Sequence, residues 1–174
     1  MPGRKCNQSE IRQLLSLILT CTLISAFILW TFRFQIILGS SMEPTFNEGS
    51  VIICMRTYSA PEPQDVVLFR TSNGVYLLKR VIAVGGQKVR VDNTTGEVWI
   101  DGVLQTDGFC APRDLDYAVE TWPGGYTGKE VQIPKGYLFC MGDNRANSLD
   151  SRDSEVGLVS IQSVWGKAVY PSGN

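Results

Sequence analysis

Hydrophobic residues follow two contrasting patterns along this chain of 174 residues. Residues 14–32 form one run of 19 residues without a charged side chain. As a helix, this run would be about 28 Å long at roughly 1.5 Å per residue, close to the roughly 30 Å apolar core of a bilayer. Beyond it, apolar residues occur in short stretches between turn-forming residues, as in β-strands. The pattern predicts one transmembrane helix followed by a mainly β domain.

Charges on either side of the apolar run predict its orientation. Arg4, Lys5 and Arg12 precede it and are opposed only by Glu10. Positive charge is retained in the cytoplasm, so residues 1–13 are expected to be a cytoplasmic segment, despite Arg33 on the other side. A cleaved signal peptide is the alternative, but its apolar core is usually only about 7–15 residues long. No Ala-x-Ala sequence follows the run, which favours an uncleaved anchor over 14–32 and an extracytoplasmic domain over 33–174.

Within residues 33–174, alternating and continuous apolar stretches predict the strands and hairpins of an antiparallel sheet. One hairpin is expected around residues 93–96, and a tighter one around Asp101-Gly102. Residues 105–130 lose the pattern and are rich in glycine, proline and aromatic residues. They are interpreted as a small insertion whose aromatic residues pack on the sheet, with contact to lipid or substrate as the alternative. The expected strands lie at residues 34–38, 51–55, 65–69, 75–84, 88–92, 97–100, 131–133, 137–141, 157–159 and 164–170.

Candidate chemistry begins at residues 39–45, Gly-Ser-Ser-Met-Glu-Pro-Thr, between the apolar run and the β region. Pro44 disfavours a helix before it, so a serine here can be displayed at a turn. A serine hydroxyl becomes a strong nucleophile only when a base takes its proton. The chain contains 0 histidines, which excludes histidine-based triads. If Ser41 is a nucleophile, its base is a lysine or a carboxylate.

A lysine in an apolar strand is the candidate base. Lys79 lies within residues 75–84 and, by the two-residue period of a strand, shares a face with Leu77, Val81 and Ala83. Burial favours the neutral amine, which can accept a proton. The alternative is an edge-strand lysine whose amine reaches water.

A polar segment at residues 142–152, Gly-Asp-Asn-Arg-Ala-Asn-Ser-Leu-Asp-Ser-Arg, directly follows an apolar strand. Together with residues 41–45 and with Leu-Lys-Arg-Val at 78–81, it resembles the motifs of the bacterial type I signal peptidases and their mitochondrial and thylakoid relatives. The motifs occur in that family's order behind a membrane span, and the resemblance covers nearly the whole chain. It implies a signal-peptidase-like β-sheet catalytic domain with a small insertion, on one N-terminal transmembrane helix.

The resemblance also implies roles for individual residues. Ser41 would be the nucleophile, with its own N–H as one oxyanion donor, and Lys79 the general base. Some family members carry a second donor, a serine, where this chain has Gly39, so a backbone group, Ser40 or water would have to complete the oxyanion hole. The implied supporting contacts are Ser148 beside the Lys79 amine, Asp143 with Arg80, Asp150 with Arg152, and Met42 against the lysine stem.

By the same resemblance, the substrates would be preproteins cut after small residues at the first and third positions before the bond. The enzyme would work in the plasma (inner) membrane or an organelle's membrane, near the export machinery, without a metal or cofactor. The net charge of −1 gives no electrostatic case for nucleic acid. Five cysteines, an odd number, leave at least one unpaired.

There are two alternatives to a signal peptidase. The self-cleaving SOS repressors also use a serine and a lysine, but they have a DNA-binding domain instead of the span. A membrane-tethered β domain without activity would be expected to lose Ser41 or Lys79.

Overall fold

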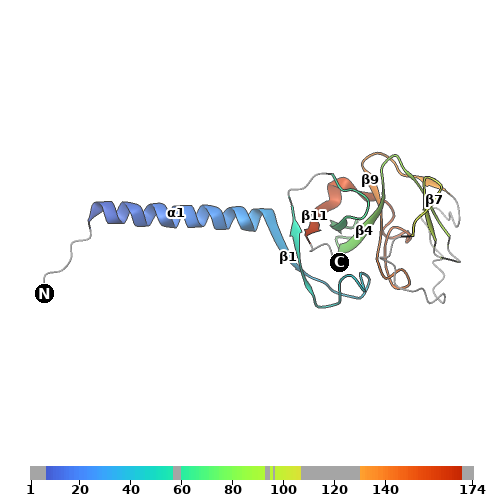
Figure 1. The fold of residues 1–174 in the computed structure, drawn as a ribbon, viewed down its shortest axis with the longest axis horizontal. Coiled ribbons are helices and arrows are strands. Elements are labelled where there is room, and N and C mark those ends of the chain that lie inside the picture. Colours follow the sequence, from blue (N-terminus) through green and yellow to red (C-terminus); the bar gives the residue numbers. More distant parts are fainter. Residues whose placement is uncertain (1–6, 57–59, 93–94, 96, 107–129, 170–174) are drawn as a thin grey trace.

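The computed structural model describes residues 7–56, 60–92, 95, 97–106 and 130–169. The chain forms one long helix that projects from a β-rich body (Figure 1). The first six residues, and nearly all of the insertion predicted at 105–130, lie outside the described residues. The main prediction of the fold class, a mainly β body behind one N-terminal apolar helix, is confirmed.

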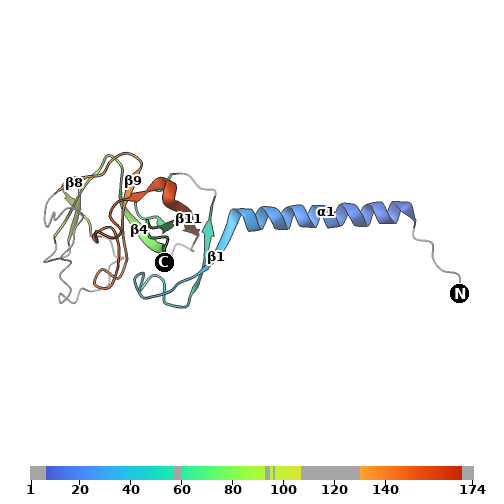
Figure 2. The ribbon, with the colours of Figure 1, turned by 180° about the vertical axis from the view of Figure 1, so that it is seen from behind.

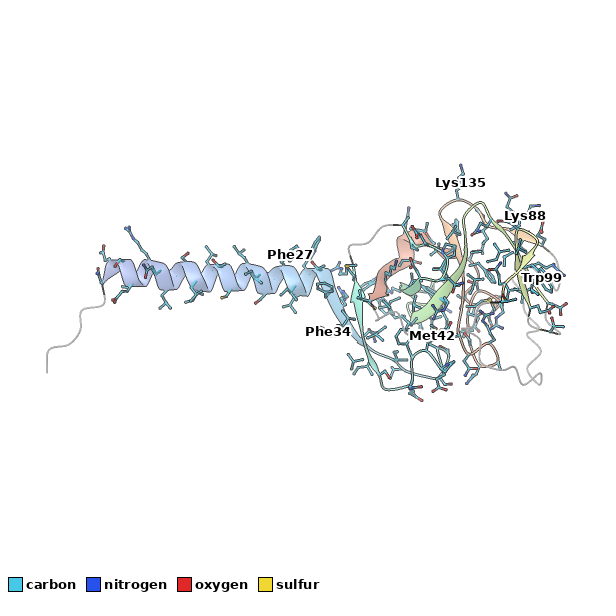
Figure 3. The ribbon with its side chains drawn as sticks, in the orientation of Figure 1. Phe27, Phe34, Met42, Lys88, Trp99 and Lys135 are labelled. Carbon is cyan, nitrogen blue, oxygen red and sulfur yellow. The ribbon has the colours of Figure 1, made fainter. Side chains whose placement is uncertain are left out.

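Helix α1 spans Gln8–Thr31 and has a mean hydropathy of 2.2 in its most apolar window. Its side chains are almost all exposed, as Figure 3 illustrates for Phe27. A helix that is apolar all round needs an apolar environment, and this one is long enough to cross a bilayer. The helix ends one residue before the end of the apolar run, because Phe32 is already extended. Phe32 begins strand β1, so no linker separates the helix from the sheet.

Strand β1 (Phe32–Ile36) therefore starts two residues earlier than the sequence predicted. Its register with β2 begins at the pair Phe32–Met55 and continues to Ile36–Val51. The remaining elements are β2 (Val51–Met55), β3 (Val66–Arg70), β4 (Tyr76–Val84), β5 (Lys88–Val91), β6 (Val98–Ile100), β7 (Val103–Leu104), β8 (Val131–Gln132), β9 (Tyr137–Met141), β10 (Val159–Ser160), the 3₁₀ turn η1 (Ile161–Ser163) and β11 (Val164–Val169).

The strands form two antiparallel sheets, seen from both sides in Figures 1 and 2. The larger sheet has the order β1-β2-β11-β3-β4-β9-β10, so β1 is an edge strand and β4 lies between β3 and β9. The smaller sheet has the order β7-β6-β5-β8. Both predicted hairpins are present: β5 pairs with β6, and β6 pairs with β7. In the tighter hairpin Asp101 and Gly102 both have positive φ, of 50° and 80°, as a type I′ turn requires.

Three apolar clusters make up the described core. One joins β4 and β9 to the smaller sheet and includes Ile82, Ala83 and Phe139. A second joins β2, β3 and β11 and includes Met42. The third includes Val67 and Val81, which lie on β3 and β4. Since β4 contributes residues to all three, including the partly buried Leu77, Leu78 and Val84, it is the strand around which the body is packed.

The sequence predicted that Leu77, Lys79, Val81 and Ala83 share one face of β4, and this prediction was wrong for Ala83. The register with β9 shifts between Val81 and Ala83, so a β-bulge interrupts the two-residue alternation. Ala83 consequently packs in the cluster that contains Ile82, not in the cluster of Val81. The apolar residues near Lys79 on its own face are therefore Leu77 and Val81, without Ala83.

Cys21, Cys54 and Cys140 are free thiols, and the last two are buried. Among the described residues, no cluster of three or more histidine, cysteine, aspartate or glutamate side chains could hold a metal ion.

Candidate active site

Ser41 lies in a compact turn that follows β1. The Ile37 N–H donates to the Ser50 carbonyl and the Gly49 N–H to the Ile37 carbonyl, which closes the loop at its base. Met42 is 1% exposed and anchors the turn in the apolar cluster of β2, β3 and β11 (Figure 3). Because the neighbouring methionine is buried, the half-buried Ser41 is held at the surface of the core.

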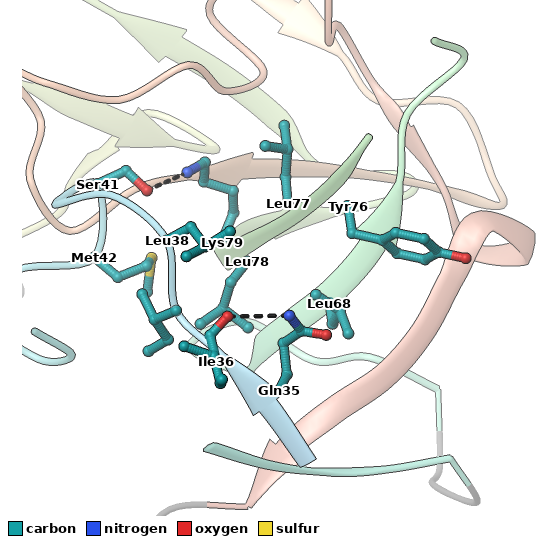
Figure 4. Close-up of a pocket in the computed structure, with 11 residues that line it drawn as sticks. Gln35, Ile36, Leu38, Ser41, Met42, Leu68, Tyr76, Leu77, Leu78 and Lys79 are labelled. Atoms are coloured by element: carbon teal, nitrogen blue, oxygen red, sulfur yellow. Dashed lines mark hydrogen bonds between the residues drawn. The ribbon is translucent and has the colours of Figure 1, made fainter. Parts of the chain in front are cut away.

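The Ser41 hydroxyl meets the amine of Lys79. Lys79 Nζ donates a hydrogen bond to Ser41 Oγ at 2.5 Å, across 38 residues of sequence (Figure 4). Lys79 is only 2% exposed, so the alternative of an amine that reaches water is wrong. The sequence predicted this pair of side chains, and the structure brings them together.

Burial governs the electrostatics of Lys79. Loss of hydration lowers the pKa of its amine from 10.5 to about 8, with Arg152 acting in the same direction. Asp150 and Asp143 oppose the shift but do not reverse it. Among the described residues, no carboxylate lies within ion-pair distance of the amine. The nearest polar partner is thus a neutral hydroxyl, and about one amine in ten is uncharged at pH 7.

Arg80, the next residue, has an ionic partner. Its Nε and Nη2 atoms donate to the two oxygens of Asp143 at 2.7 and 2.6 Å, with both side chains 0% exposed. Thr45 adds a hydrogen bond from its hydroxyl to Asp143 at 2.5 Å. The predicted pairing of Asp143 with Arg80 is present, and through Thr45 it ties the serine turn to residues 142–152.

Asp150 and Arg152 form a second buried pair. Arg152 Nε and Nη2 donate to Asp150 at 2.8 Å each, and the Gly142 N–H donates to the same carboxylate at 3.0 Å. Burial opposes ionisation of Asp150, but the charge and hydrogen bonds of Arg152 hold its pKa below the ordinary value. The hydrogen bond from Gly142 to Asp150 closes this segment into a loop, and the Ser151 N–H ties the loop to β9 by donating to the Cys140 carbonyl.

Ser148 has a buried hydroxyl without a well-formed hydrogen bond among the described residues. It lies close enough to Asp150 to help lower the pKa of that carboxyl. It also limits the space at Gly142, where a Cβ would come within 2.7 Å of the Ser148 side chain and of the Ser41 carbonyl. Glycine at position 142 therefore permits the close approach of this loop to the serine turn.

Three further contacts at this junction were not predictable from the sequence. Asn144 Nδ2 donates to the Ser40 carbonyl at 3.2 Å, and the Asn144 N–H donates to the Ser41 carbonyl at 3.1 Å. Asn147 Nδ2 donates to Ser40 Oγ at 3.0 Å. The polar density of residues 142–152 was the available signal, but it could not say which amide would reach the serine turn.

A small cavity of about 90 Å³ opens beside Ser41 and Lys79. Gln35, Leu68 and Tyr76 also line a wider groove of about 540 Å³, which runs past Trp165 to Leu29 at the end of α1. Gly39 has φ of +88°, and its N–H donates to the Glu48 carboxylate. The remaining cavity-lining residues drawn in Figure 4 are Ile36, Ile37, Leu38, Met42, Leu77 and Leu78.

The site has the parts of a serine hydrolase that works without histidine: a displayed hydroxyl, a buried amine with a lowered pKa and an adjacent cavity. A family model described as "Signal peptidase, peptidase S26" matches residues 11–172. The chain therefore belongs to the signal peptidase family, and it is a serine endopeptidase of that family.

Individual relatives agree with this assignment. The chain is 31% identical to the probable signal peptidase I-1 of Synechocystis over 76% of this chain and 66% of that protein. It is 30% identical to signal peptidase I U of Bacillus subtilis over 91% of this chain and 87% of the relative. The thylakoidal processing peptidase 1 of Arabidopsis thaliana is 28% identical over 76% of this chain, but only 39% of its own length.

A solved structure supports the fold. The crystal structure of a signal peptidase I from Enterococcus faecalis matches with a TM-score of 0.51 and 25% identity, over 66% of this chain and 100% of that one. The curved β body is thus shared with that enzyme.

Proposed function

We propose that this peptidase removes N-terminal signal peptides from exported preproteins, with Ser41 as nucleophile and Lys79 as general base. The observation that carries the proposal is the 2.5 Å contact between Ser41 Oγ and a lysine amine that is 2% exposed. A neutral amine at this distance is within reach of the hydroxyl proton. Signal peptidase I relatives supply the class of reaction.

The chemistry follows from the geometry. The Lys79 amine takes the Ser41 proton as Oγ attacks the scissile carbonyl, and the Ser41 N–H stabilises the resulting oxyanion. The ammonium then gives its proton to the departing amine, which leaves an acyl ester on Ser41. Water, deprotonated by the same lysine, releases the signal peptide and restores the hydroxyl.

The surrounding residues keep the amine in place and dry. The buried Arg80–Asp143 pair holds residues 142–152 against the dyad, and the Asp150–Arg152 pair stabilises the loop itself. Met42 and Leu78 line the cavity and limit water near Lys79. The charged groups around Lys79 thus have partners of their own, and the Lys79 amine is the group that changes charge during the reaction.

The cavity favours small side chains in the substrate. Its volume of about 90 Å³ favours an alanine side chain over an aromatic one. Strand β1 is a sheet edge beside the site, so an extended preprotein can pair with it and present alternate side chains to one face. This geometry supports cleavage after Ala-x-Ala.

Helix α1 would anchor the enzyme in the membrane, and the position of the substrate gives a reason for this anchor. The bond to be cut lies just beyond an apolar segment of the substrate that is itself in the bilayer. With residues 1–13 in the cytoplasm and 33–174 outside, the direct junction of α1 and β1 keeps Ser41 near that segment. We therefore propose that the enzyme works in the plasma (inner) membrane, near the export machinery.

The test compares two adjacent serines. Full-length wild type, Ser41→Ala and Ser40→Ala are incubated with a preprotein that carries an Ala-x-Ala site, and the product's N-terminus is sequenced. Ser41→Ala should abolish processing while Ser40→Ala retains substantial activity. A dead Ser40 variant beside an active Ser41 variant would show that the nucleophile has been misassigned.

Two further measurements test specificity and orientation. Phenylalanine in place of either alanine should block cleavage, and equal rates for alanine and phenylalanine would exclude this specificity.

A protease added outside correctly oriented, sealed vesicles should digest residues 33–174 and spare the first dozen. Protection of the large domain would reverse the proposed orientation.

A further inference from the structure

The carbonyl groups on both sides of Ser41 are held by one residue of a distant loop. Asn144 Nδ2 donates to the Ser40 carbonyl at 3.2 Å, and the Asn144 N–H donates to the Ser41 carbonyl at 3.1 Å. The Glu43 N–H also donates to the Ser40 carbonyl, at 3.1 Å. Asn144 is 104 residues away in sequence from the serine whose carbonyl its side chain contacts.

The Ser40 carbonyl and the Ser41 N–H belong to the same peptide unit. This unit is planar, and in the trans form its C=O and N–H point in opposite directions. Two donors on the carbonyl therefore fix the direction of the N–H. Within the described chain the Ser41 N–H makes no hydrogen bond, so it is available to an outside acceptor.

We infer that Asn144 is a positioning residue that aims the Ser41 N–H at the developing oxyanion. This inference rests on the proposed role of Ser41. Its importance follows from Gly39, which has no side-chain donor to share the oxyanion with that N–H. A single backbone donor stabilises a transition state well only if its direction is fixed beforehand.

The neighbouring asparagine provides a matched control. Asn147 lies on the same loop and also contacts Ser40, but its Nδ2 reaches the hydroxyl and not the peptide carbonyl. It is exposed, whereas Asn144 is half-buried. The two residues thus separate the effect of holding the peptide from the effect of holding the loop on Ser40.

The test measures kcat and KM of full-length variants with an Ala-x-Ala preprotein. Removing one oxyanion donor costs about 100- to 1,000-fold in kcat, so misdirecting it in Asn144→Ala should cost about 10- to 100-fold. KM and the pKa of the alkaline limb should stay unchanged, because Lys79 keeps its surroundings. Asn144→Asp, which keeps the size but loses the donor, should lose at least as much, whereas Asn147→Ala should lose less than about threefold.

A second measurement isolates the oxyanion. A peptide aldehyde ending in Ala-x-Ala forms a tetrahedral adduct with Ser41, and its inhibition constant should rise in Asn144→Ala in proportion to the fall in kcat. Preprotein binding, measured as Kd in the inactive Ser41→Ala background, should not change when Asn144→Ala is added.

Several outcomes would overturn the inference: near-normal kcat in Asn144→Ala, an equal loss in Asn147→Ala, a loss confined to KM, or a shifted pH profile. A loss that follows unfolding of both Asn144 variants, while Asn147→Ala stays folded, would equally reduce Asn144 to a structural residue. Cleavage by Ser41→Ala would instead refute the proposed function itself.

Discussion

Lys79 and Arg80 are adjacent on β4, and both are buried, yet the fold treats their charges in opposite ways. Arg80 is 0% exposed, and its Nε and Nη2 atoms donate to the two carboxylate oxygens of Asp143. Lys79 is 2% exposed, and in the described part of the chain its amine bonds only to the Ser41 hydroxyl. A buried charge needs a partner or becomes neutral. One strand therefore carries a permanent cation for structure on one face and a removable proton for chemistry on the other.

Removing the amine of Lys79 should have the largest effect on activity, because it abolishes the difference between Lys79 and Arg80 that matters for catalysis. Lys79→Met has a similar volume but cannot accept a proton, so preprotein cleavage should fall at least about 1,000-fold, towards the level without a base. Lys79→Arg should fail as well, since a guanidinium keeps its proton. Steady-state cleavage rates measure both. The control is Lys88→Met, because Lys88 pairs with Glu130 on the smaller sheet and is half exposed. Near-normal turnover in Lys79→Met would refute the role of the amine.

Removing the partner of Arg80 should be the largest change in stability. Asp143→Ala leaves a buried guanidinium without its carboxylate, which costs about 3–5 kcal/mol in the free energy of unfolding. The double variant Arg80→Met/Asp143→Leu should recover much of this loss, because it also removes the unpaired charge. Urea unfolding of the detergent-solubilised chain provides the measurement. A double variant that is as unstable as Asp143→Ala would show that the carboxylate acts through other contacts, such as Thr45.

Replacing Lys79 should change stability in the opposite direction from replacing Asp143. The pKa of its amine is about 8 in the folded chain, against the ordinary value of 10.5 expected once the chain unfolds, so between these values the unfolded chain binds more protons. The free energy of unfolding should rise with pH over that window and be reduced by a constant amount below it. Lys79→Met should consequently be more stable at pH 7, by up to roughly 3 kcal/mol, with no difference above about pH 10.5. Equal unfolding curves at both pH values would mean that Lys79 is not destabilised by its burial.

The smallest expected effect is the pH dependence of activity, which distinguishes the titrating Lys79 from the permanently charged Arg80. With a pKa of about 8 for the Lys79 amine, kcat/KM should rise about tenfold from pH 7 and level off above pH 9. Arg80 should add no limb in this range, because its charge is fixed. Initial rates at several pH values, with a check that the enzyme stays folded, give the profile. A flat profile between pH 7 and 9 would contradict an amine that loses its proton before attack.

The sequence by itself determined the elements and the candidate chemistry. The apolar run predicted α1, period and turn residues predicted most strands, and the absence of histidine directed attention from Ser41 to Lys79. Such local patterns survive folding because they record which faces are buried and where the chain turns. The motifs in residues 142–152 indicated a site, but not the contacts within it.

Only the tertiary structure decided the details that depend on distant residues. The bulge after Val81 moves Ala83 to another cluster, and no sequence period announces such a shift. That Asn144 and not Asn147 reaches the Ser40 carbonyl depends on how the loop crosses the serine turn. The low pKa of Lys79 likewise arises because surrounding strands and the serine turn exclude water from its amine. Hydration and hydrogen-bond partners are properties of assembled neighbours, so they are set by packing and not by any one segment of the chain.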